Sequence, residues 1–131
     1  MYKIIIMETR FKMREKNLIC PLKFLMNTFG GKWKMPIICI LSGDKPQRYS
    51  MIKRRLRNIT NMMLSQSLKE LEADGLIHRE QFNEVPPRVE YSLTEKGKSA
   101  LPFLTEAAKW AINDINTNGM KTFCSECVNI C

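Results

Sequence analysis

Residues 50–75 constrain the fold most, because they encode two helices joined by a turn of about three or four residues. Ser50 can cap the first helix, which we expect over residues 51–57, and Thr60 or Asn61 can cap the second. Two helices this close in the chain cross at a steep angle and share one core. The spacing therefore predicts a helix-turn-helix.

Leucines mark the buried side of the second helix, which Gly75 ends. Leu64, Leu68 and Leu71 recur at the spacing of one helix face, so we expect them in the core. The other faces carry polar or long side chains: Met62, Ser65, Gln66 and Lys69. This helix thus has a surface that its own packing does not use.

The neighbouring segments supply the remaining elements. We expect a helix over residues 22–29, a helix from about Trp33–Met35 to Gly43, strands over 76–82 and 89–93, and a final helical region after Thr94. Pro102 lies inside that region and should kink or restart it. The order predicts an α+β, mainly helical fold: a winged helix-turn-helix with a two-stranded wing and a C-terminal dimerisation helix.

Two apolar stripes run along the final helix beyond Pro102. One contains Leu101, Leu104, Ala108, Ala111 and Ile115, and the other contains Phe103, Ala107 and Trp110. One stripe suffices for packing on the chain's own core, so the second predicts a partner helix and a homodimer. The alternative is that both stripes wrap into one core.

The whole chain has a net charge of +8, and its positive charge is concentrated in the first half. Residues 45–57 hold six basic and no acidic residues, a field that attracts phosphate backbones, although a solvated helix face is the alternative. No apolar run is long enough for a bilayer span or a signal peptide, so we expect a cytoplasmic protein. His78 is the single histidine, and neither a phosphate loop nor a nucleophile elbow occurs, so we expect no enzyme.

Four stretches of the sequence resemble one family: CPLKF, GGKWKMPIICILSG, MLSQSLKELEADGLI and EVPPRVEYSLTEKG. Together, from Cys20 to about Trp110, they resemble the HxlR-type transcriptional regulators, which are bacterial winged-helix proteins related to the MarR group. The resemblance implies a homodimeric DNA-binding regulator whose first and last helices form the dimer. We therefore expect a flexible basic lead over residues 1–17, a DNA-binding and dimerisation domain over 18–118, and a cysteine-containing tail over 119–131.

Within such a fold the exposed start of the second motif helix enters the major groove of double-stranded DNA. Its candidate contacts are Thr60, Asn61, Met62, Ser65, Gln66 and Lys69, and the candidate phosphate contacts are Arg48, Lys53, Arg54 and Arg57. Arg88, at the tip of the wing, could enter the minor groove or bind a phosphate. The alternatives are an ordinary polar surface and, for Arg88, an ion pair with Glu84 or Glu90.

The cysteines suggest a signal. Cys20 matches the cysteine before proline that resembles a thiol sensor of electrophiles or oxidants in some family members, and the alternative is an inert thiol. Cys39 lies in an apolar helix and should be core. The C-terminal tail contains Cys124, Cys127 and Cys131, which supply three of the four ligands that zinc prefers. These cysteines could form a metal site, and the alternative is that they remain unmetalled thiols. We expect no bound cofactor.

These observations predict a sequence-specific DNA-binding transcriptional regulator that reads a pseudo-palindromic operator as a homodimer and that responds to electrophiles or oxidants through a cysteine. Two alternatives remain. One is a winged-helix protein–protein interaction module without DNA binding, and the other is a metal or redox sensor that uses the C-terminal cysteines.

Overall fold

The computed structural model describes residues 18–120 and divides the chain into two compact units at Gly31. The first unit contains helix α2 (Pro21–Phe29), which follows Cys20 directly and has proline in its first turn, where no backbone donor is needed. Gly30 leaves the helical conformation and donates its backbone N–H to the carbonyl of Met26. The predicted helix over residues 22–29 is thus confirmed.

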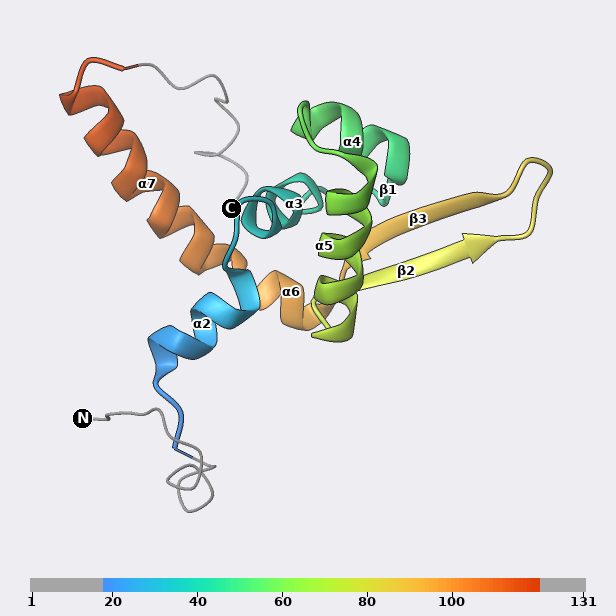
Figure 1. The fold of residues 1–131 in the computed structure, drawn as a ribbon, viewed down its shortest axis with the longest axis horizontal. Helices are drawn as coiled ribbons and strands as arrows, with labels where there is room; N and C mark the ends of the chain where they lie inside the picture. Colours follow the sequence, from blue (N-terminus) through green and yellow to red (C-terminus); the bar gives the residue numbers. More distant parts are fainter. Residues whose placement is uncertain (1–17, 121–131) are drawn as a thin grey trace. The chain divides into compact units, whose positions relative to one another are not determined.

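The second unit begins at Lys32 and contains the motif helices and the wing. Its elements in order are α3 (Lys34–Ile40), β1 (Gln47–Arg48), α4 (Tyr49–Leu56), α5 (Asn61–Ala73), β2 (Ile77–Phe82), β3 (Arg88–Leu93), α6 (Glu95–Ser99) and α7 (Leu101–Thr117). Figure 1 shows the long β2–β3 hairpin extending away from α5, with α4 near the N-terminal end of α5. This arrangement confirms the winged helix-turn-helix.

A small antiparallel sheet forms the wing, in the order β1-β3-β2. The register pairs Ile77 with Leu93 at its base and Phe82 with Arg88 near its tip. Strand β1 was not predicted, because two polar residues give no period-two pattern; Gln47 pairs with Tyr91 of β3. The hairpin is therefore fixed along one edge by the segment that leads into α4.

The core lies where α3, α4 and α5 meet the base of the hairpin. Six large side chains are almost completely buried: Ile37, Ile38, Leu41, Ile52, Leu64 and Leu71. Each such side chain contributes about 1.5–3 kcal/mol through its removal from water. Leu68 is buried as well, so the leucine spacing identified the inner face of α5 correctly.

The ends of the motif helices partly correct the predicted caps. Thr60 caps α5, because its Oγ1 accepts a hydrogen bond from the backbone N–H of Met63 at 3.1 Å. The prediction that Ser50 caps α4 is wrong: the helix already begins at Tyr49 and its cap position is Arg48, without a side-chain cap bond. Strand β1 extends the backbone up to Arg48, so Ser50 falls inside the first turn.

The C-terminal end of α5 is tied to the segment that starts α6. Gly75 adopts a positive φ of 76°, the conformation that terminates a helix at low steric cost for glycine. Thr94 donates its hydroxyl to the carbonyl of Gly75 at 2.6 Å, and Lys96 donates to the carbonyl of Asp74 at 2.6 Å. Thr94 also caps α6 by accepting from the N–H of Gly97.

The predicted break at Pro102 is confirmed, because α6 ends at Ser99 and α7 restarts at Leu101 with proline in its first turn. Leu104 of the first apolar stripe is buried, whereas Phe103 and Trp110 of the second stripe are exposed, Trp110 at 72%. Within residues 18–120 no helix is both long and apolar enough to cross a membrane.

Candidate nucleic-acid interface

The first two turns of α5 expose most of the predicted base-contacting side chains. Thr60, Asn61, Met62, Gln66 and Lys69 are exposed, and Ser65 is half-buried. Met62 is 78% exposed, which excludes a packing role within this chain. Met62, Gln66 and Lys69 therefore lie on the side of α5 opposite the buried leucines, with Ser65 beside them and with Thr60 and Asn61 at the start of the helix.

Tyr49, at the start of α4, holds the beginning of α5 in place. Its hydroxyl lies 3.2 Å from both the backbone carbonyl and the side-chain Oδ1 of Asn61, and 3.3 Å from Oγ of Ser65. Sequence reasoning missed this residue, because its partners lie 12 and 16 positions further along the chain. The one feature of the sequence that could have pointed to Tyr49 is its hydroxyl group within a segment of basic residues.

Gln66 belongs to a second network behind the exposed surface. Its Nε2 donates to Oε2 of Glu70 at 2.7 Å, and the other carboxylate oxygen of Glu70 lies 2.8 Å from the ammonium of Lys34 in α3. The hydrogen bond from Lys34, then that from Gln66, lowers the pKa of the Glu70 carboxyl below its ordinary value. The Lys34 side chain is only 12% exposed, whereas that of Glu70 is 44% exposed.

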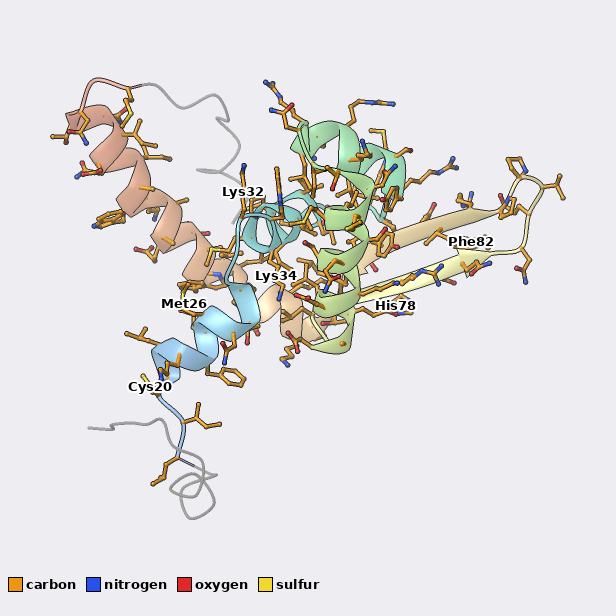
Figure 2. The ribbon with its side chains drawn as sticks, in the orientation of Figure 1. Cys20, Met26, Lys32, Lys34, His78 and Phe82 are labelled. Atoms are coloured by element: carbon orange, nitrogen blue, oxygen red, sulfur yellow. The ribbon has the colours of Figure 1, made fainter. Side chains whose placement is uncertain are left out.

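Basic side chains surround α4, as the sequence predicted. Arg48, Arg54 and Arg57 are exposed and Lys53 is half-buried. Figure 2 shows nitrogen-tipped side chains projecting from α4 into solvent. Arg57 has a φ of 65°, a rare conformation for a residue with a side chain, and it directs the chain from α4 into the turn before α5. These residues form a positively charged surface beside the first turn of α5.

Arg88 on the wing has three partners within the chain. Its guanidinium lies 3.2 Å from Glu84, 3.3 Å from Glu90 and 4.1 Å from the ring centre of Phe82. Its Nε is within ion-pair distance of Glu90 but is not aligned for a hydrogen bond. The ion pair that the sequence left open as an alternative is present, with both glutamates, while a contact of Arg88 with DNA stays a prediction.

A hollow of about 390 Å³ lies between α5 and the base of the hairpin. Ser65, Lys69, Glu72 and Arg79 line it together with Leu68 and Tyr91. It adds Arg79 of β2 to the cations near α5, a residue that the sequence analysis did not select. Tyr91 is buried here.

The predicted signal residues are only partly within the described chain. Cys20 is half-buried at the cap position of α2 and makes no side-chain cap hydrogen bond. Cys39 is half-buried in α3. Cys124, Cys127 and Cys131 lie outside the described residues, as does the predicted lead over residues 1–17. Between residues 18 and 120 no three His, Cys, Asp or Glu side chains are grouped closely enough to hold a metal ion.

Comparison with known proteins places this chain in a family. The sequence matches the HxlR-like helix-turn-helix family over residues 28–118. A helix-turn-helix transcriptional regulator of Halalkalibacterium halodurans, itself uncharacterised, is 45% identical over 107 residues, which is 81% of this chain and 95% of that relative.

Two solved structures share both sequence and fold with the chain. The helix-turn-helix regulator YtcD aligns with a TM-score of 0.71 at 43% identity, over 75% of this chain and 99% of YtcD. The redox regulator HypR in its oxidised form aligns with a TM-score of 0.67 at 40% identity, over 72% of this chain and 96% of HypR. The chain therefore belongs to the HxlR-like helix-turn-helix family, whose members are DNA-binding transcriptional regulators and not enzymes.

Proposed function

We propose that this protein regulates transcription by binding a specific, pseudo-palindromic DNA sequence as a homodimer. The observation that carries the proposal is the exposed outer side of α5, whose polar side chains lie beside the cations of α4. A major groove admits one helix, and a helix end with this composition can contact base edges while its neighbours bind phosphates.

The proposed roles divide the surface into reading and positioning contacts. Ser65 and Gln66 read bases, with Thr60, Asn61, Met62 and Lys69 around them. Arg48, Lys53, Arg54 and Arg57 bind phosphates and fix the orientation of the protein on the duplex. Arg88 exchanges its glutamate partners for the DNA backbone or the minor groove.

Dimerisation is proposed from apolar side chains that the chain leaves in water. Phe103 and Trp110 of α7 are exposed, and Leu22, Phe24 and Met26 of α2 are between 55% and 70% exposed. Covering these side chains with the same helices of a second copy would remove them from water. Two α5 helices about 34 Å apart would then contact successive major grooves on one face of the duplex.

The test is a selection of tight-binding duplexes from a randomised DNA library, followed by fluorescence anisotropy with the selected and an unrelated duplex. We expect the selected duplex to bind about 10³-fold or more tightly at physiological salt, with inverted half-sites. Gln66→Ala should reduce this ratio, whereas Lys109→Ala on α7 should not. Absence of any binding at low salt would favour the protein–protein interaction module instead.

A thiol signal is the second part of the proposal. It is supported by the half-buried thiol of Cys20 at the start of α2, which makes no side-chain cap hydrogen bond, and by the similarity to a protein described as a redox regulator. We expect mild oxidation with diamide to change the affinity for the selected duplex. Cys20→Ser should abolish that change, whereas Cys39→Ser should keep it; a change that survives in Cys20→Ser would assign the signal elsewhere.

The C-terminal cysteines remain a separate proposal as a metal or redox site. The measurement is the zinc and iron content of protein purified with and without oxygen. A stoichiometric metal that Cys124→Ser and Cys127→Ser remove would support the site, and protein free of both metals in both preparations would exclude the metal version.

A further inference from the structure

We propose that Glu70 is a positioning residue for base recognition: it fixes the side-chain amide of Gln66 in one of its two orientations and so presents an adenine-reading edge. The inference rests on the proposed DNA-binding function and adds a determinant of sequence preference that does not itself touch DNA. It is carried by the contacts among Lys34, Glu70 and Gln66.

A carboxylate can only accept hydrogen bonds, so the group that faces it must be a donor. Gln66 and Glu70 lie one helical turn apart on α5, and the amide nitrogen of Gln66 is 2.7 Å from Oε2 of Glu70. Turning the amide by 180° would bring its oxygen against the carboxylate and exchange an attraction for a repulsion. Glu70 thus selects one amide orientation.

The selected orientation leaves a complementary edge free. An amide has one N–H trans and one N–H cis to its oxygen. In the proposed arrangement Glu70 takes the trans N–H of Gln66, which leaves the cis N–H beside Oε1. Adenine offers a donor at N6 and an acceptor at N7 in the major groove, which matches one oxygen and one N–H side by side. The amide can therefore bind Glu70 and adenine at the same time, with different hydrogens.

Lys34 makes Glu70 able to hold this orientation. Lys34 belongs to α3, and its ammonium lies 2.8 Å from Oε1 of Glu70. Because the Lys34 side chain is nearly buried, this ion pair restricts the movement of the Glu70 carboxylate. Figure 2 shows Lys34 beside α5. Because Lys34 and Gln66 lower the pKa of Glu70, the group stays a charged acceptor at neutral pH.

Glu70→Gln is the discriminating substitution, because it keeps the shape of the side chain. Lys34 will take the amide oxygen of the new residue, which turns its NH₂ group toward residue 66. Gln66 must then accept with its own oxygen, and its adenine-reading edge is inverted. We expect the discrimination for adenine over other bases, at one position of each half-site, to fall about threefold to thirtyfold.

The probe is the duplex that the wild-type protein selects from the randomised library, with each half-site position varied in turn. Glu72→Gln is the matched control, since it removes the same charge from the same helix two residues further on. Both variants should gain similar affinity for random DNA, but only Glu70→Gln should lose the adenine preference. Lys34→Met should reduce that preference in the same direction while keeping the carboxylate.

The double variant with Gln66→Ala decides whether Glu70 acts through Gln66. If the inference holds, Glu70→Gln changes nothing further in the Gln66→Ala background. An unchanged base preference in Glu70→Gln, or an equal loss in the Gln66→Ala background, would overturn it while leaving the DNA-binding function intact. Failure of the wild-type protein to bind any duplex would instead refute the proposed function, and this inference with it.

Discussion

Arg88 lies among three groups of its own chain that would compete for its guanidinium in the proposed DNA complex. Glu84 and Glu90 supply negative charge and Phe82 supplies an aromatic face, while the side chain remains 25% exposed. Because the side chains of Arg88 and Glu90 are mostly buried, water screens this ion pair only partly. A phosphate that takes the guanidinium must therefore replace these contacts with charge-assisted hydrogen bonds of its own.

Arg88→Ala should weaken binding to the selected duplex about tenfold, because one charge-assisted contact is lost. The measurement is the dissociation constant by anisotropy, accompanied by a thermal unfolding curve. Glu84→Gln is the informative partner variant, since it removes a competitor and should strengthen binding. Unchanged DNA affinity in Arg88→Ala with a lowered unfolding temperature would show that Arg88 only stiffens the wing.

Arg54→Ala tests a phosphate contact, whose signature differs from that of a base contact. Arg54 is exposed on α4, and its guanidinium contacts the sulfur of Met51 one turn earlier. We expect weaker binding to the selected and unrelated duplexes by the same factor, and a salt slope reduced by about one. Equal affinity at all salt concentrations would remove Arg54 from the interface, and Lys109→Ala controls for the lost charge.

The sequence did not predict the hydrogen bonds of the site that join residues far apart in the chain. Helical spacing was enough to place Ser65 and Gln66 on the outer side of α5, because periodicity is a local property. The partners that orient them, Tyr49 and Lys34, come from other helices and depend on how those helices pack. A sequence without aligned relatives gives no sign of such pairs.

Among the elements, α6 lies close against the backbone of Leu76, the residue before β2. A Cβ at Gly97 would collide with the carbonyl of Leu76, at the point where the hairpin leaves α5. Gly97→Ala should therefore destabilise the fold by about 1–3 kcal/mol, through the shift that the added methyl forces. Urea unfolding measures this, and Gly43→Ala, where the new Cβ meets nothing, should change stability little. A neutral Gly97→Ala would show that α6 can move aside.

Element length explains which parts of the fold were predictable. Helices α5 and α7 span 13 and 17 residues, long enough for an apolar period to stand out. Strand β1 has two residues and exists only because β3 offers a free edge beside it. The error at Ser50 has the same origin, since the chain enters α4 directly from a strand that the sequence did not announce.

At the scale of the whole molecule, the proposed homodimer depends on apolar side chains that are exposed in the single chain. Trp110 is 72% exposed on α7, so Trp110→Glu should place a charge in the proposed interface at little cost to the isolated chain. We expect a monomer in sedimentation experiments and a large loss of affinity for duplexes with two half-sites. Asn116→Glu, which adds the same charge on another side of α7, is the control, and a dimer that persists in Trp110→Glu would exclude this face.

The hydrogen bonds that join the end of α5 to the start of α6 couple the orientations of these two helices. Thr94 and Lys96 donate hydrogen bonds to the carbonyls of Gly75 and Asp74, directly after α5, and α7 begins one residue after α6. The 13 residues of α5 extend about 20 Å from this joint. A tilt of about 5° at the joint would displace the opposite end of α5 by roughly 2 Å, more than the tolerance of a hydrogen bond. In the proposed homodimer, a change in how α7 meets the second copy would thus need only a small rotation to move α5 out of register with the DNA.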